Sequence, residues 1–251
     1  MSHGQTLAAD IIGAVRALYR YPVKSTAGQA LSKAFVTDGG LEHDRKWAVY
    51  TADGGIASGK RTHRFRPVPG LMHWSSSSDL PHPEVPMLFS PDGSAYRADE
   101  PAASRALSEA FDQHVELHRE TATPHHDETP LHLLTTSSLA ALANLSGLPV
   151  DERRFRANLI IDTGPVPGFP EDQWIGSELV IGDGVRIRLG SGMPRCVMVD
   201  QSQHGLAAEP KILKLLGAHN NTKLGLQAHT VRGGVVRAGD SVVLRRGPAG
   251  M

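Results

Sequence analysis

Cysteine is almost absent from this sequence, and so is any excess of charge. Cys196 is the single cysteine among 251 residues. This excludes an internal disulfide framework and a four-cysteine zinc or iron–sulfur site, because each needs several thiolates. Lysine plus arginine and aspartate plus glutamate both total 26, so the formal net charge is zero. No global field therefore draws the chain to nucleic acid or to an anionic membrane, and any anion site has to be local.

Long hydrophobic runs are missing too. No run approaches the roughly 18 apolar residues of a membrane span, and the N-terminus lacks the charged start and apolar centre of a signal peptide. We therefore expect a cytoplasmic protein without a membrane span. Hydrophobic residues make up 40% of the chain and charged residues 21%. That balance is ordinary for a globular protein with one large domain or two small ones.

Strand signals outnumber helix signals along the chain. The predicted strands and hairpins are residues 11–21, 45–51 with a turn at 53–55, and 177–189 with a turn at Asp183-Gly184. The predicted helices are residues 102–111, 135–145 and 208–216. This balance predicts an α+β, β-rich fold: a β-barrel with helical insertions. The polar, histidine-rich stretch 114–128 is the best candidate for a domain boundary.

One segment nearly matches a nucleotide-binding motif. GGIASGKR, residues 54–61, follows the pattern G-x-x-x-x-G-K-[ST] except at its last position. Arg61 stands there, so the hydroxyl that binds magnesium is absent. The prolines of the following RFRPVPG also oppose the helix that this motif needs. The segment therefore favours an ordinary hairpin.

Histidines and serines offer weaker candidates. His125, His126 and His132, with Asp127, could coordinate a metal ion. Thirteen histidines make chance clusters common, and this spacing does not enforce convergent ligands, so a solvated loop is favoured. Ser191 lies in GSG and lacks the G-x-S-x-G elbow of a hydrolase nucleophile.

Cys196 leaves three interpretations open: a small buried hydrophobe, a nucleophile or a metal ligand. The apolar run Val197–Val199 reads as a core strand, and beside such a run a single cysteine is most often buried and inert. Against this, Arg195 favours the thiolate, which attacks electrophiles and binds metals. Gly190, Gly192 and Pro194 suggest an irregular backbone that a ligand could approach closely.

Six segments together carry a family resemblance. They are YPVKS (21–25), DGGLEHDRKW (38–47), RFRANLII (154–161), EDQW (171–174), LVIGD (179–183) and PRCVMVD (194–200). In this order the chain resembles the MOSC proteins, and more closely those with an N-terminal MOSC β-barrel extension, such as the mitochondrial amidoxime-reducing component and its bacterial relatives. The resemblance implies a smaller N-terminal β-barrel-like domain at residues 11–118 and a MOSC domain at residues 119–247.

The resemblance also implies a molybdenum cofactor, a pterin with its own phosphate, and places Cys196 as the thiolate ligand to molybdenum. A soft thiolate suits that metal. The residues that match cofactor-binding positions are Lys24, Ser25, Arg45, Thr135, Ser138, Arg156, Asn158 and, beside the ligand, Arg195. Glu171, Asp172 and Trp174 match a stretch near the metal. Thr135 and Ser138 begin a predicted helix, which is a natural seat for a phosphate.

By this resemblance the chain is a molybdoenzyme that reduces N-hydroxylated or other N-oxygenated small molecules. A separate protein would supply electrons, because one cysteine cannot ligate an iron–sulfur cluster. Two alternatives stay open: a sulfur-transfer protein with a persulfide on Cys196, and a non-catalytic carrier of the cofactor. Ala157, Met193 and Gln201 stand where the family often has proline, a second cysteine and proline, and His204-Gly205 closes the turn after them. These departures put the substrate class in question.

Overall fold

A closed seven-stranded β-barrel forms the larger part of the computed structural model, which describes residues 9–79 and 81–246. Around the barrel the strands follow the order β13, β12, β16, β15, β14, β18 and β1, and β1 pairs with β13 to close it. β12 and β13 run parallel, and the other neighbours are antiparallel. The strand bounds are β1 Ala9–Arg20, β12 Leu131–Thr135, β13 Leu159–Asp162, β14 Glu178–Ile181, β15 Val185–Pro194, β16 Lys223–Arg232 and β18 Ser241–Arg245.

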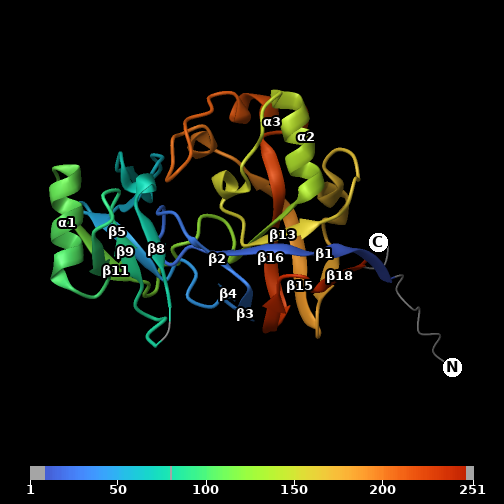
Figure 1. Cartoon of the computed structure of the whole chain (residues 1–251), viewed down its shortest axis with the longest axis horizontal. Coiled ribbons are helices and arrows are strands. Elements are labelled where there is room, and N and C mark those ends of the chain that lie inside the picture. Colours follow the sequence, from blue (N-terminus) through green and yellow to red (C-terminus); the bar gives the residue numbers. More distant parts are fainter. Residues whose placement is uncertain (1–8, 80, 247–251) are drawn as a thin grey trace.

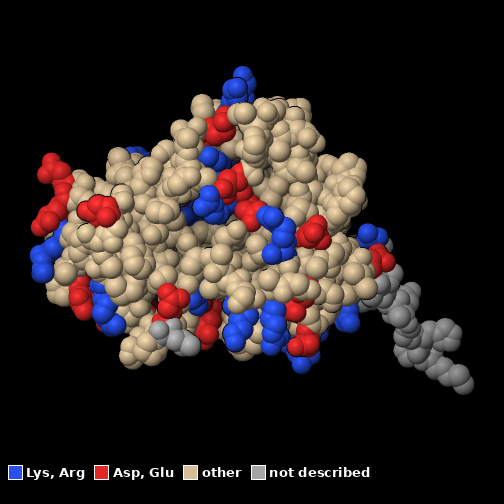
Figure 2. Space-filling model, in the orientation of Figure 1, with Lys and Arg blue, Asp and Glu red and all other residues tan. Residues whose placement is uncertain are grey.

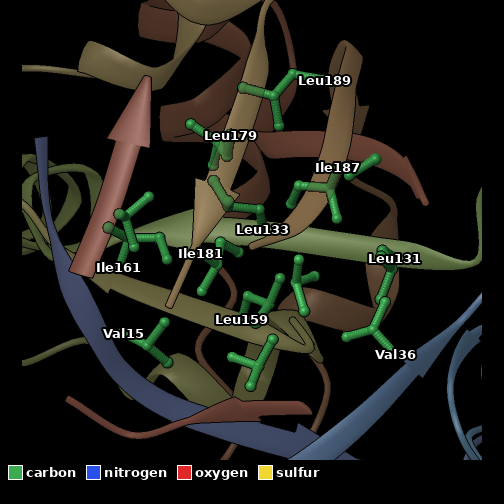
Figure 3. Packing of buried hydrophobic residues seen from close by; sticks show 14 of the residues in the cluster. Val15, Val36, Leu131, Leu133, Leu159, Ile161, Leu179, Ile181, Ile187 and Leu189 are labelled. Atoms are coloured by element: carbon green, nitrogen blue, oxygen red, sulfur yellow. The ribbon is translucent and has the colours of Figure 1, made fainter. Parts of the chain in front are cut away.

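The barrel interior is filled by alternating apolar side chains. On β15 the side chains of Val185, Ile187 and Leu189 are buried, whereas Arg188 is exposed. Figure 3 shows such residues from several strands pointing toward one another. Burial of each large apolar side chain contributes about 1.5–3 kcal/mol. This alternation is the one expected from the sequence, and the hairpin predicted at residues 177–189 is confirmed as β14 and β15.

Closure of the barrel depends on a close approach at Gly13. Its φ is +149°, and a Cβ there would lie 1.8 Å from the carbonyl oxygen of Asp162 on β13. The pairing of β1 with β18 shifts register between Ile11 and Gly13. A residue with a side chain could not occupy this position without moving the backbone.

A smaller lobe lies beside the barrel (Figure 1). It holds a four-stranded sheet in the order β11, β5, β6, β7, a three-stranded sheet in the order β10, β9, β8, and helix α1. The bounds are β5 Trp47–Thr51, β6 Ile56–Ser58, β7 Phe65–Pro67, β8 Ser75–Ser77, β9 Met87–Phe89, β10 Ala95–Arg97, α1 Pro101–Phe111 and β11 Val115–Arg119. Its own core includes Val49, Leu71, Trp74 and Leu107. The β-rich fold with a barrel and few helices is therefore confirmed.

Short strands join the two lobes. β2 (Gln29–Leu31) pairs with β1, and β17 (Gly234–Arg237), β3 (Lys33–Thr37) and β4 (Gly40–Leu41) form a separate three-stranded sheet. β1 is thus a barrel strand, although it lies within the predicted first domain. The predicted boundary at residues 118/119 falls just before the last residue of β11, and it stays a prediction.

Helices α2 (Thr136–Ser146) and α3 (Ile212–Asn220) pack against the barrel. Thr135 caps α2 by accepting a hydrogen bond from the backbone N–H of Ser138, as its hydroxyl-rich start predicts. The helix predicted at residues 208–216 is shifted. Asp200 accepts a hydrogen bond from the N–H of Leu213 at its start, and Asn221, in a left-handed conformation, ends it rather than Gly217.

Of the helices in the described residues, none is long and apolar enough to cross a membrane. Acidic and basic side chains are interspersed over the face shown in Figure 2, in line with the zero net charge.

Candidate functional site: a cationic cavity around Cys196

One cavity of about 160 Å³ collects most of the residues predicted for the site. Strand ends and loops of both lobes line it. Six cationic side chains and two carboxylates face it: Lys24, Lys60, Arg45, Arg154, Arg156 and Arg195, with Asp127 and Glu128. Although the chain has no net charge, this cavity is strongly basic. It is therefore a local site of attraction for anions.

Cys196 is half-buried and lines this cavity. The strand predicted after it is wrong: Val197–Val199 is a single 3₁₀ turn, in which the N–H of Val199 bonds to the carbonyl of Cys196. Val197 is 47% exposed, and only Val199 reaches the core between α2 and α3. A three-residue apolar run with one buried side chain cannot sustain a core strand, so the chain turns immediately after the thiol.

Two arginines fix the backbone on either side of Cys196. Arg195 donates to the carbonyls of Phe155 at 2.9 Å and of Leu224 at 3.4 Å, which hold the end of β15. Arg154 is buried and donates to the carbonyls of Val199, Gln201 and Ala207. These bonds define the loop after the thiol, which extends toward the smaller lobe (Figure 1, orange).

The same loop contacts the smaller lobe directly. Gln201, which stands where the family often has proline, donates to the carbonyl of Gly59 at 2.9 Å. His204 donates its backbone N–H to the carbonyl of Met72. Met193, which stands where the family often has a second cysteine, is buried and lines the cavity. Ala157, which stands where the family often has proline, is also buried. The departures from the family pattern therefore lie in the wall of the cavity or against it.

Arg45 and Arg156 both stack on the ring of Tyr21. Their guanidinium carbons lie 4.9 and 4.4 Å from the ring centroid. Arg45 is paired with Asp44 and donates to the carbonyl of Arg156 at 3.0 Å. Arg156 has no such partner: its Nη2 is inaccessible to solvent and makes no hydrogen bond within the described residues. Burial and the neighbouring Arg45 lower the pKa of Arg156 to about 10, so it is still a cation at neutral pH.

Strained backbone also collects at this site. Ser25, Arg45 and Arg156 have φ values of +67°, +52° and +56°. Non-glycine residues seldom adopt this left-handed region, and such strain concentrates at ligand sites. Three residues predicted to bind the cofactor are therefore held in costly conformations by the surrounding structure.

Lys24 and Ser25 follow β1 in a turn that enters the cavity. Lys24 is buried, with its ammonium paired to Asp127 and placed 4.5 Å from the centroid of the Phe65 ring. Burial lowers the pKa of Lys24 to about 8, and Asp127 opposes this shift. Ser25 donates to the carbonyl of Ala57 at 3.3 Å.

Asn158 is buried on the cavity wall and acts mainly as a connector. Its Oδ1 accepts from the backbone N–H of His132 at 3.2 Å and from Arg45 at 3.5 Å, while its amide donates to the carbonyl of Tyr19. It thereby positions Arg45.

Thr135 and Ser138 do not line the cavity. Both hydroxyls donate to Oε2 of Glu171, at 2.7 and 2.6 Å, and all three residues are buried. Burial raises the pKa of Glu171. The phosphate site expected at this helix start is therefore occupied by a carboxyl group of the chain itself. Glu171, Asp172 and Trp174, which were expected near the metal, are also absent from the cavity lining.

The fold brings part of the histidine cluster together: His126 and His132 line the cavity with Asp127. His132 also contacts Arg195 and the carbonyl of Leu224, whereas His125 is buried outside the cavity lining and donates from Nδ1 to the carbonyl of Arg45. Within residues 9–79 and 81–246, no three His, Cys, Asp or Glu side chains are arranged to hold a metal ion. A metal bound at Cys196 would take its other ligands from outside these side chains.

His125 predicts a loss of stability in acid. Burial lowers its pKa to about 4, against an ordinary value of 6.5. The unfolded chain takes up this proton below about pH 6.5 and the folded chain does not, so stability is lost as pH falls toward 4. We expect the free energy of unfolding to drop by about 2 kcal/mol for this residue. Urea unfolding across this range measures it. A His125→Gln variant with an equal drop would contradict the assignment.

Several residues at the site were not predicted as cofactor ligands from the sequence; Lys60, Asp127 and Arg154 line the cavity, and Tyr21 lies against Arg45 and Arg156. Lys60 belongs to the rejected nucleotide motif, and no helix follows it, which confirms that rejection. Asp127 was considered only as a metal ligand. Arg154 and Tyr21 begin the segments RFRANLII and YPVKS, in which other residues were predicted to bind the cofactor. These residues reach the site through contacts between segments that are distant in the sequence, and sequence spacing does not reveal such contacts.

The cavity fits a phosphate-bearing cofactor with a thiolate-bound metal. The buried, unpartnered Nη2 of Arg156 needs an anionic acceptor. The single thiol of the chain lies in the same cavity.

The fold and this cavity define a β-barrel protein with a basic pocket around one thiol. Comparison with protein families identifies both parts of the chain: residues 120–243 match the MOSC domain, and residues 12–110 match the MOSC N-terminal beta barrel domain. The chain belongs to the MOSC-domain proteins that carry this N-terminal barrel. This family is associated with binding of the molybdenum cofactor.

Among solved structures, the chain is similar to the YUAD protein from Bacillus subtilis. The two are 14% identical with a TM-score of 0.53, over 96% of this chain and 100% of that one, and this likeness supports the fold alone. It is also similar to YiiM from Geobacillus stearothermophilus, at 17% identity and a TM-score of 0.37, over 47% of this chain and 55% of that one. No curated protein matches the chain.

Proposed function

We propose that this chain binds the molybdenum cofactor in the Cys196 cavity and reduces N-hydroxylated and other N-oxygenated compounds. One observation carries the proposal: the only thiol of the sequence shares a cavity with Arg156, a cation that has no anionic partner in the part of the chain that the structure describes. Cys196 is the metal ligand, and Arg156, with Arg45 beside it, receives the cofactor phosphate. Lys24 and Ser25 also line this cavity.

The bound molybdenum centre supplies two-electron oxygen-atom transfer. In the overall reaction the substrate N–O bond breaks, its oxygen leaves as water, and two electrons and two protons are consumed. The residues of this chain hold and orient the reacting groups: Arg154 and Arg195 fix the backbone on both sides of the thiol. We place the electron donor outside this sequence, because its single cysteine cannot ligate an iron–sulfur cluster.

The test is reduction of an amidoxime by protein purified from a cofactor-competent host, with a reduced viologen dye as electron donor. We expect the amidine as product and consumption of two electrons per molecule. Bound molybdenum without any reduction would instead identify a cofactor carrier. One extra sulfur atom on Cys196, seen by mass spectrometry and transferred to an acceptor, would identify a sulfur-transfer protein. Either result would overturn the reductase assignment.

A further inference from the structure

Asp127 pairs with two of the six cations that line the cavity. Its Oδ1 pairs with the ammonium of Lys24, and its Oδ2 pairs with the ammonium of Lys60. Both ammonium groups lie near the Phe65 ring, at 4.5 and 5.0 Å from its centroid. Three segments far apart in the sequence therefore meet at one carboxylate.

In the described part of the chain, Arg154, Arg156 and Arg195 of the same cavity form no salt bridge. Arg156 stacks on Tyr21, and its Nη2 has no hydrogen-bond partner in the described residues. Arg45 beside it is paired with Asp44, which is its one salt-bridge partner among the described residues. An incoming anion therefore finds an unpaired donor at Arg156, whereas Lys24 and Lys60 are already paired with a carboxylate of the chain.

We propose that Asp127 is a specificity-determining residue: by neutralising Lys24 and Lys60 it makes the cavity accept a ligand with one phosphate group and disfavour a ligand with a diphosphate. Selectivity of this kind arises as much from repulsion of the wrong ligand as from attraction of the right one. The inference rests on the proposed function in taking this cavity as the ligand site.

The physical reason is the placement of like charges. A single phosphate at Arg156 leaves both lysine pairs with Asp127 intact. A second phosphoryl group would need the lysines, and it would either approach the Asp127 carboxylate or displace it. The first brings like charges together, and the second breaks two charge-assisted hydrogen bonds.

The test uses the full chain without cofactor, titrated calorimetrically with inorganic phosphate and with pyrophosphate. For the wild type we expect pyrophosphate to bind no more than about threefold tighter than phosphate. For Asp127→Asn, which preserves shape and removes charge, we expect pyrophosphate binding to tighten by about tenfold or more. Phosphate binding should tighten by less than about threefold.

Three further variants locate the effect. Asp127→Glu keeps the carboxylate and should keep the wild-type preference. Asp53→Asn removes a carboxylate from the pair with Arg66, which lies outside the cavity, and should change neither anion. Arg156→Met should abolish phosphate binding. If Asp127→Asn fails to fold by circular dichroism, Asp127→Ser carries the same expectation.

The proposal is overturned if loss of the Asp127 charge tightens both anions equally or tightens neither. It is also overturned if Asp53→Asn produces the same change. These measurements need no molybdenum. Wild-type protein purified without molybdenum would contradict the proposed function but would not change the ratio of pyrophosphate to phosphate affinity. If the Asp127 variants failed to change that ratio, this proposal would be overturned and the molybdenum content would be unaffected.

Discussion

Protein with Cys196→Ser is expected to be purified with less than about one tenth of the wild-type molybdenum, and its reductase activity should fall at least about a thousandfold. A serine hydroxyl is a hard ligand that is not ionised at neutral pH, whereas a thiol ionises more readily to a soft thiolate. The change replaces a single sulfur atom by oxygen at a half-buried position. Plasma emission spectrometry and the amidoxime assay measure the two effects.

The matched control for this variant is Ser191→Ala, because Ser191 is exposed on β15 and does not line the cavity. It should retain both molybdenum and activity. Equal molybdenum in Cys196→Ser and wild type would show that the thiol is not the ligand, and Cys196 would then be the small half-buried side chain that composition alone favours.

Replacement of Arg156 by methionine is expected to weaken cofactor binding about a hundredfold without loss of fold stability. Methionine preserves much of the contact with Tyr21 but provides no donor for an anion. The Nη2 of Arg156 is buried without a partner in the described residues, which costs free energy in the empty protein, so replacement of this half-buried side chain by an apolar one is neutral or stabilising. Cofactor titration of the cofactor-free chain and thermal unfolding measure the two effects.

Arg153→Met is the control for this second variant. Arg153 lies three residues earlier, is 49% exposed and pairs with Asp151. Its loss should leave cofactor binding unchanged. If Arg156→Met destabilised the fold as strongly as it weakened binding, Arg156 would be a structural residue, and the anion assignment would lose its main support.

Local patterns predicted the barrel strands well, because alternation and turn chemistry act over a few residues. The β14–β15 hairpin and the hydroxyl-capped α2 are both encoded locally. The turn after Cys196 was not predicted, because three apolar residues resemble a strand. Tertiary contacts determine their conformation: Val199 packs in the core with α2 and α3, and Arg154 donates to the carbonyls of Val199 and Gln201.

The candidate site was predictable only where a motif carried it. Lys24, Arg45, Arg156 and Cys196 were identified by resemblance, and the structure brings them to one cavity. Thr135 and Ser138 matched the same pattern, yet they donate to Glu171 outside the cavity. Asp127 and Lys60 are 67 residues apart and meet through tertiary structure, so no spacing could pair them.

The most direct test of the whole account is the metal and pterin content of the wild-type protein purified from a cofactor-competent host. The account predicts about one molybdenum atom per chain, together with the fluorescence of an oxidised pterin after acid release. Pterin and molybdenum should both be lost on Arg156→Met. Wild-type protein with neither molybdenum nor pterin, from a host that loads other molybdoenzymes, would contradict it.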